Sequence, residues 1–252
     1  AEKVDRDFLR AVVAFQSKQE SQALNVLNGI FEAADARWLA GMIELRGGNW
    51  MLATDHLEFA LEKETTLGEL CERNSISIEI AYAITTEVQA HLGPDPRSTR
   101  LALAEAYQGC EKLVDALSLL KEMNQHTPED FIIALSLAEI AFEIEDALKM
   151  EMLVLIDILD ATKVPEGLAW SYDFARARAL ERSGALSEAI VSYTRAMSDE
   201  NIPEDMYKLA WYEKALSFEE TGDRTRCRQE LSGLYATDKS FADVENRLRN
   251  SN

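Results

Sequence analysis

The residue types that most often carry out chemistry in proteins are present in this chain, but they stand far apart. No histidine has a second ligand at a metal-binding spacing such as His-x3-His, and no two cysteines form a Cys-x-x-Cys pair. An odd number of widely spaced cysteines also argues against a disulfide framework. We therefore expect no metal site, no cofactor and no disulfide. The residues concerned are His56, His91, His126, Cys71, Cys110 and Cys227.

Acidic pairs such as Glu219-Glu220 are the remaining candidates for catalysis. They are expected on the solvated surface of an acidic helical protein, and the chain has no Gly-x-Ser-x-Gly nucleophile motif. A paired-acid hydrolase on a helical toroid remains the enzymatic alternative. Its site would need aromatic side chains beside the acids to hold a sugar, whereas Trp38, Trp50, Trp170 and Trp211 are scattered. We expect a protein without enzymatic activity.

The elements that would position any such residue form a repeat. The segment 177–196 has the pattern Ala-x2-Leu-x3-Gly-x4-Ala-x3-Tyr-x2-Ala, with Pro203 shortly after it. This spacing predicts two antiparallel helices with Gly184 in the turn between them. Ala189 is then a small residue where the helices touch, and Tyr193 fills the space towards the next hairpin.

Further copies of the pattern recur along the chain. A second well-defined copy contains Gly41, Gly48, Ala53, Leu57 and Ala60, and a moderate one lies at 104–128. Weaker copies lie at 11–30, 138–154 and 211–231, in near register with the strong ones. Gly47-Gly48 is thus a turn between helices rather than a phosphate-binding loop.

These copies resemble the tetratricopeptide repeat (TPR) family, whose period is about 34 residues. The resemblance implies an all-α, right-handed superhelical solenoid of about six TPR-like hairpins. One hairpin cannot bury its apolar face alone, so stacked hairpins would share a continuous core. Generic helical hairpins of another solenoid family are the alternative, with the same physics.

One stretch interrupts the repeat. Ala116 follows Ala53 by 63 residues, well over one period of about 34 residues. Within this stretch Ile76, Ile78, Ile80 and Tyr82 alternate with small or polar residues, which favours a half-buried strand. A return strand over 88–92 after a turn near 83–86 would make a β-hairpin, and Gly93-Pro-Asp-Pro96 would end it. A degenerate helix is the alternative, because several of these residues also share a helical face.

The predicted organisation is therefore N-terminal hairpins at 1–62, an insertion at 63–97, and hairpins with a C-terminal capping helix at 98–252. Three roles are open for the insertion. It is a spacer packed on neighbouring helices, a lid on the groove, or an edge to which a partner or a second copy adds a strand.

Charge limits the partners. The formal net charge is −19, from 45 acidic and 26 basic residues, so nucleic acid is not expected as a partner. Residues 129–160 hold nine acids against Lys149 alone, which makes a solvated face or a site that attracts a basic segment. No run of about 20 apolar residues is present to span a membrane. The chain begins with Ala1 rather than Met, so a longer or anchored parent protein is one interpretation; otherwise we expect a cytoplasmic location.

The resemblance places the binding surface on the first helix of each hairpin. It implies a concave groove that is apolar in its N-terminal half and acidic in its C-terminal half. The groove candidates are Phe8, Val12, Trp38, Met42, Leu101, Glu105, Leu135, Glu139, Phe174, Arg178 and Tyr212. TPR domains that hold the carboxylate of a chaperone tail use Lys, Asn and Arg at such places, so this role is not expected here.

The predicted function is a scaffold or adaptor that binds a protein or peptide, for example an amphipathic helix or a basic segment, in this groove. The alternative is a self-assembling structural subunit of a homo-oligomer that uses the insertion or an end hairpin as its interface.

The repeat register makes a direct prediction about stability. Ala189→Trp and Ala53→Trp should each lower the free energy of unfolding by at least ~1–3 kcal/mol, because a bulky side chain would force the two helices apart. A thermal melt of each variant beside the wild type measures this, and an unchanged melting temperature would show that the register is wrong.

Overall fold

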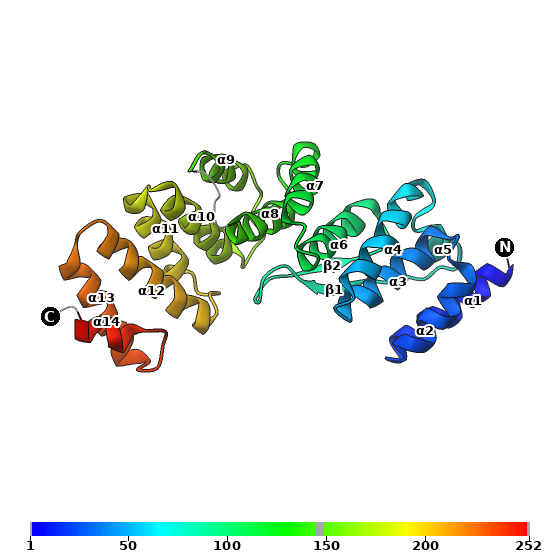
Figure 1. Cartoon of the computed structure of the whole chain (residues 1–252), viewed down its shortest axis with the longest axis horizontal. Coiled ribbons are helices and arrows are strands. Elements are labelled where there is room, and N and C mark those ends of the chain that lie inside the picture. The colour runs from blue at the N-terminus through cyan, green and yellow to red at the C-terminus, as the bar shows by residue number, and fades with distance from the viewer. Residues whose placement is uncertain (1, 145–148, 251–252) are drawn as a thin grey trace. The chain divides into compact units, whose positions relative to one another are not determined.

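The computed structural model describes residues 2–144 and 149–250 and consists of helices with one small antiparallel ribbon. The chain divides into two compact units, Ala1–His126 and Thr127–Asn252, which are considered separately below (Figure 1). The all-α repeat fold predicted from the sequence is thus confirmed. None of the described helices combines the length and the apolar character needed to cross a bilayer.

Unit 1 contains three helical hairpins within residues 2–126, interrupted by the insertion. The hairpins are α1 (Glu2–Gln16) with α2 (Glu20–Leu27), α3 (Ala34–Arg46) with α4 (Trp50–Glu62), and α6 (Pro96–Gly109) with α7 (Leu113–His126). A single 3₁₀ turn, Asn28–Ile30, follows α2, and another, Glu64–Thr66, follows α4.

Unit 2 contains three hairpins and a final short helix among its described residues. They are α8 (Phe131–Glu143) with α9 (Lys149–Asp160), α10 (Ala169–Ser183) with α11 (Leu186–Ser198), α12 (Glu204–Glu220) with α13 (Arg224–Thr237), and then α14 (Val244–Asn250). Of the acidic stretch 129–160, Glu145 and Asp146 lie outside the described residues.

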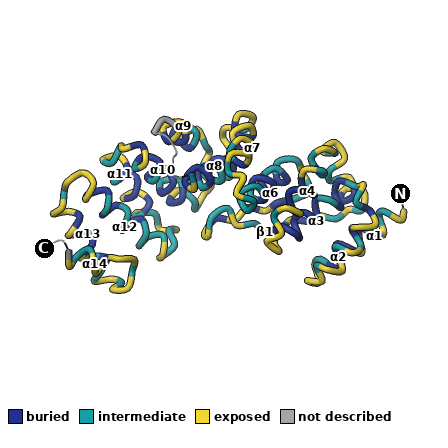
Figure 2. The backbone as a smooth tube through the Cα atoms, viewed as in Figure 1, coloured by how far each residue is buried: buried dark blue, intermediate teal, exposed yellow. Residues whose placement is uncertain are grey.

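Stacking of the hairpins builds the core. The second helix of a hairpin packs against the first helix of the next, as α4 does on α6 and α11 does on α12. Buried residues therefore concentrate on the first helices, which have neighbours on both sides (Figure 2). This is the nearest-neighbour arrangement that a repeat needs, since one hairpin alone leaves its apolar face in water.

Five of the turns between paired helices share one backbone conformation. Each has a residue in the left-handed region within two residues of the end of the first helix, with φ between 60° and 85°. These residues are Lys18, Gly48, Glu111, Gly184 and Gly222. In the Gly184 turn, the Gly184 N–H donates to Glu181 O and the Ala185 N–H to Leu180 O, each at 2.9 Å. The same two bonds recur in the other four turns, which makes each a Schellman motif that satisfies the last carbonyls of the helix.

Small residues set the distance between paired helices. A Cβ atom at Gly41 of α3 would come within 2.8 Å of Leu57 Cγ on α4. Ala53 and Ala189, which the repeat register marks as contact positions, are both fully buried. Tyr193 is fully buried as well, with its ring against Phe174 of α10 at a centroid distance of 5.8 Å.

The insertion is a short helix followed by a β-ribbon, so its strand interpretation is confirmed and its helical alternative is not. Helix α5 (Glu69–Arg73) precedes strands β1 (Ile80–Ala83) and β2 (Gln89–Leu92), which pair antiparallel with Ile80 opposite Leu92. The ladder is shorter than the predicted strand, because residues 76–79 belong to no strand and β1 begins at Ile80. Asp95 then caps α6 by accepting from Ser98 N at 2.9 Å, with Pro96 in the first turn.

Two aspartates hold α5 against the repeat, and neither role could be predicted from the sequence pattern. The buried Asp35 of α3 accepts from Gly68 N at 2.6 Å and from Cys71 N at 3.0 Å, so it caps the N-terminus of α5. Asp5 of α1 accepts from Arg73 and Asn74 at the other end. Burial raises the pKa of Asp35, although the backbone N–H donors oppose that effect.

The turn residues predict a gain in stability at one site and a loss at another. Glu111→Gly should raise the free energy of unfolding by ~0.5–1 kcal/mol, because the left-handed strain it relieves outweighs the added flexibility of the unfolded chain. Gly222→Ala is the matched control and should lower it by ~1–2 kcal/mol, since a Cβ there meets open space and only the backbone conformation is penalised. Urea unfolding of both variants measures the pair, and shifts of the same sign would refute the argument.

Candidate protein-binding surface

The apolar residues predicted to line the groove are core residues, which corrects the prediction of an exposed apolar surface. All seven are less than 9% exposed because they pack between neighbouring hairpins or against their own partner helix. They are Phe8, Val12, Trp38, Met42, Leu101, Leu135 and Phe174. The prediction placed them on the right helices, and its alternative for Trp38 and Met42, packing in the core between hairpins, is the one that the burial supports.

Glu105, the polar candidate of unit 1, meets the insertion instead of open solvent. The Tyr82 hydroxyl of β1 donates a hydrogen bond to the Glu105 carboxylate of α6, and burial together with this carboxylate raises the pKa of Tyr82. Strand β2 packs along α6. The ribbon therefore occupies the face of α6 on which the prediction placed part of the groove.

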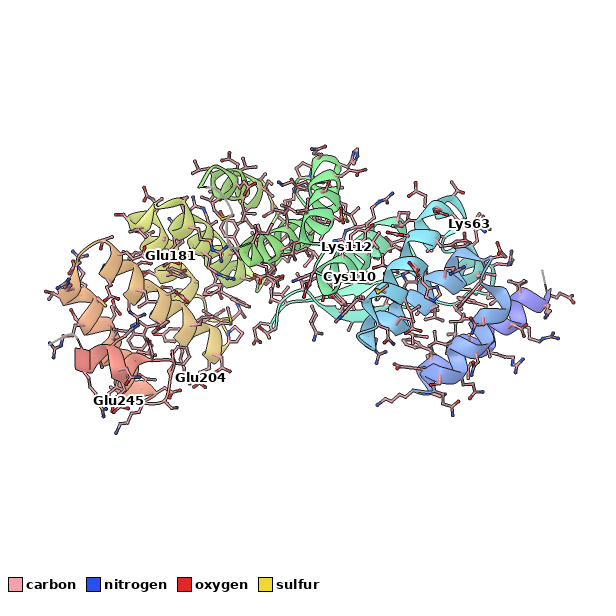
Figure 3. The ribbon with its side chains drawn as sticks, in the orientation of Figure 1. Lys63, Cys110, Lys112, Glu181, Glu204 and Glu245 are labelled. Atoms are coloured by element: carbon pink, nitrogen blue, oxygen red, sulfur yellow. The ribbon has the colours of Figure 1, made fainter. Side chains whose placement is uncertain are left out.

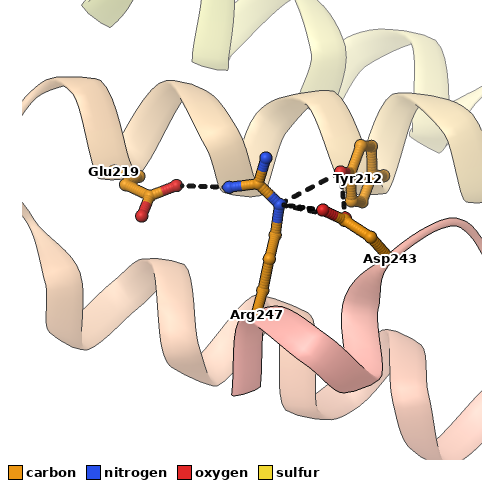
Figure 4. A network of polar contacts seen from close by, with 4 residues as sticks. All are labelled: Tyr212, Glu219, Asp243 and Arg247. Carbon is orange, nitrogen blue, oxygen red and sulfur yellow. Dashed lines mark hydrogen bonds and ion pairs between the residues drawn. The ribbon is translucent and has the colours of Figure 1, made fainter. Parts of the chain in front are cut away.

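Tyr212, the last candidate, belongs to a polar network that holds the C-terminal helix (Figure 4). Arg247 of α14 donates to Glu219 at 2.8 Å, to Asp243 at 3.0 Å and to the Tyr212 hydroxyl at 3.2 Å. Beneath the network, Val244 is fully buried in a cluster with Phe218, Leu231 and Leu234, so α14 covers the end of unit 2.

Glu139 and Arg178 are predicted residues that remain partly accessible on unit 2, and two further acids join them. Glu139 comes from α8, Arg178 and Glu181 from α10, and Glu213 from α12, so three successive first helices contribute (Figure 3 labels Glu181). We call Glu139, Glu181 and Glu213 the acidic row. Side-chain exposure is 34% for Glu139 and 32% for Arg178, which leaves both within reach of a partner.

Arg178 is the cation of this surface. Its Nη1 lies 3.7 Å from Glu139 Oε1, and its guanidinium stacks over the Phe142 ring at 4.2 Å from the centroid. Arg182, one turn further along α10, lies near the same Phe142 ring at 5.2 Å from its centroid, and its Nη2 donates to the Phe142 carbonyl at 2.6 Å. Arg178 is the cation that acts on all three carboxylates of the row.

The acidic row is half-buried, and burial dominates its electrostatics. Desolvation is the main cause that raises the pKa of Glu139, Glu181 and Glu213. Arg178 opposes the shift at all three carboxylates, whereas Glu181 adds to the shift at Glu213. Arg247 also opposes the shift at Glu213, after Arg178.

The members of the row differ in how they are held. Glu181 accepts from the Tyr193 hydroxyl at 2.9 Å and from Ser217 Oγ at 3.2 Å, which fixes its carboxylate. The Glu213 carboxylate has no hydrogen-bond or ion-pair partner among the described residues. Glu213 was missed from the sequence because its position on α12 falls outside the repeat pattern used to choose the candidates.

Residues 2–144 and 149–250 bring no three His, Cys, Asp or Glu side chains together in a way that would hold a metal ion. The three thiols are unpaired; Cys71 and Cys227 are buried, and Cys110 lies half-exposed at the α6–α7 turn beside Lys112 (Figure 3). Burial raises the pKa of Cys71 to about 12, which keeps it a neutral thiol.

The raised pKa values predict a pH-dependent effect of neutralising the row. A carboxyl whose folded pKa is raised stabilises the fold below its unfolded pKa, near 4.5, and this contribution is lost as the pH rises through the folded pKa. The double variant Glu139→Gln/Glu213→Gln should therefore be more stable than the wild type at pH 7.5, with the difference vanishing near pH 4.5. Urea unfolding across this range tests it, and a constant difference at all pH values would contradict it.

Comparisons with known proteins agree with this architecture. No protein-family model matches the sequence, and no curated protein sequence matches it. Among solved structures, the N-terminal domain of the EccA1 ATPase from the ESX-1 secretion system of Mycobacterium tuberculosis is similar over 99% of this chain and 90% of its own, with a TM-score of 0.65 and 16% identity.

Two other solved structures show the same fold. The apo form of RapI aligns over 96% of this chain and 86% of its own, with a TM-score of 0.57 and 13% identity. A putative kinesin light chain with nearly identical TPR-like repeats, from Podospora anserina, aligns over 82% of this chain and 96% of its own, with a TM-score of 0.54 and 14% identity. At these identities the likeness is one of fold, and the chain is a TPR-like helical-repeat protein in its fold.

Proposed function

We propose that this protein is a non-enzymatic, TPR-like scaffold that binds a segment of a partner protein on the first-helix surface of unit 2. The observation that carries the proposal is the acidic row, in which Arg178 acts on three half-buried carboxylates from α8, α10 and α12. TPR-like proteins generally serve as protein-interaction scaffolds, which supports the same role.

The chemistry of the row favours a cationic side chain as its ligand. Glu213 lacks a hydrogen-bonding partner of its own, and a Lys or Arg placed beside it would lower its pKa and form a charge-assisted hydrogen bond in a partly desolvated site. The net charge of −19 would also attract a basic segment over a longer range. The partner segment we propose is therefore an amphipathic or extended stretch that carries Lys or Arg.

The contacts that the carboxylates of the acidic row already make favour binding rather than catalysis. Glu181 is held by two hydroxyl donors and Glu139 faces Arg178, so both contribute to the packing of successive hairpins. The three unpaired thiols agree with a reducing compartment, and we propose a cytoplasmic location.

Peptides selected from a random display library on the immobilised wild type test the proposal. They should be enriched in Lys and Arg, and Glu213→Gln should weaken their binding by about tenfold, the effect of ~1.4 kcal/mol from one charge-assisted contact. The matched control is Glu188→Gln, which removes the same charge from an exposed position on α11 and should change the affinity little. Affinity measured by fluorescence anisotropy should also fall as salt is added.

Two results would overturn this assignment. Selected peptides without basic residues would show that the row does not choose the ligand. Equal losses for Glu213→Gln and Glu188→Gln would show that only the overall charge of the protein matters.

A further inference from the structure

The ribbon of unit 1 has an open backbone edge on β1. Strand β2 lies between β1 and α6, since it packs on α6 on one side and pairs with β1 on the other (Figure 1). Strand β1 covers Ile80–Ala83, and all four of its residues pair with β2. The opposite side of β1 faces no other strand among the described residues.

The alternation of hydrogen bonds along the ladder shows which backbone N–H and C=O groups point outward from that edge. Ile84 N donates to Val88 O at 2.8 Å, which marks Ile84 and Val88 as a hydrogen-bonded pair. Antiparallel pairs alternate, so Tyr82 and Ile80 bond to β2, whereas the N–H and C=O groups of Ala81 and Ala83 point away from it. No hydrogen bond of the described residues uses these four backbone groups.

The edge is held in place rather than loose. Ile78, Ile80, Val88 and Leu92 are all at most 5% exposed on the inner face of the ribbon. Together with the contact of Tyr82 to Glu105, this burial fixes the register, because a slip by one residue would turn the apolar side chains into solvent. A partner strand would therefore meet a preformed template and would not need to order it.

Natural edge strands are usually protected by lysine, proline, a bulge or a covering element. The outward residues of β1, Ala81 and Ala83, are small, neutral and exposed, and no charged residue occurs from Ile80 to Thr86. The edge thus has the features of a strand-addition site rather than those of a blocked edge.

Charge indicates which kind of segment fits. Glu79 and Glu87 are exposed at the two ends of the neutral run, and neither carboxylate has an ion-pair partner among the described residues. The chain as a whole carries a net charge of −19, which disfavours pairing with a second copy.

We propose that β1 accepts an extended segment of a partner protein as a third strand, with small or β-branched neutral residues in the middle of the segment and Lys or Arg at its ends. The backbone of Ala81 and Ala83 would supply the hydrogen bonds, and Glu79 and Glu87 would select the flanking charges. This site is separate from the acidic row of unit 2 and does not depend on it.

The test uses a designed probe peptide, acetyl-Lys-Thr-Val-Thr-Val-Thr-Lys-amide, with a fluorescent label and binding measured by anisotropy. Ala83→Pro should weaken binding by about tenfold or more, because it removes an outward N–H and places a ring on the edge. It leaves the β1–β2 bonds intact, since the Ala83 N–H does not take part in them. Ala83→Thr, which keeps the N–H, is the matched control and should bind like the wild type.

Two N-methylated forms of the peptide give a second readout that needs no protein variant. Methyl groups on the valine nitrogens and methyl groups on the threonine nitrogens block opposite edges of the peptide strand. One form should bind the wild type and the other should not. Glu79→Gln/Glu87→Gln should weaken binding of the unmodified peptide and flatten its salt dependence. Glu188→Gln, which removes an exposed charge on α11 outside both proposed sites, should leave both unchanged.

Three outcomes would overturn the proposal. The first is no binding of the probe by the wild type at millimolar concentration. The second is equal binding of the two N-methylated forms, which would exclude a strand contact even if Ala83→Pro failed to fold. The third is a wild type that is dimeric by light scattering and becomes monomeric in Ala83→Pro, which would assign the edge to a second copy of this chain.

Discussion

The left-handed residue after the first helix of a hairpin is the constraint on which the rest of the structure depends. It reverses the chain within a few residues and satisfies the last carbonyls of the helix through the two Schellman bonds. Because the reversal is so tight, the two helices must lie in contact, and contact positions such as Gly41 and Ala189 must be small. Two turns adopt this conformation without glycine, at Lys18 and Glu111. The same turn geometry therefore recurs along the chain even where glycine is absent.

Close packing of this kind decides where polar groups end up. A first helix packs against the second helix of its own hairpin on one side and against the preceding hairpin on another. Its apolar side chains are therefore buried in the core. Among the residues that stay partly accessible on α8, α10 and α12 are Glu139, Glu181 and Glu213. Partial burial is what distinguishes Glu139, Glu181 and Glu213 from the many solvated acids of the chain, since desolvation raises their pKa and strengthens any interaction with a cation.

The insertion shows how a repeat protein accommodates a foreign element. Asp35 and Asp5 fasten the two ends of α5 to α3 and α1, and the chain then runs back beneath α6 as the ribbon. The apolar face of the ribbon is thereby buried, and its backbone is left open on one edge. Units 1 and 2 thus differ in what their surfaces offer, which is a hydrogen-bonding strand edge in one and a row of carboxylates in the other.

The sequence by itself determined the hairpins, the turn positions and the ribbon, because these depend on local spacing: small residues at fixed intervals, glycine at Gly48, Gly184 and Gly222, and alternation from Ile76 to Tyr82. It also determined the acidic character of the protein. Only the tertiary structure decided that Phe8, Trp38 and Leu135 lie in the core, that Asp35 caps α5 from 33 residues away, and that Glu213 joins Glu181 and Glu139. These outcomes depend on contacts between elements distant in the chain, and helical periodicity marks a residue's face without showing how many neighbours cover that face.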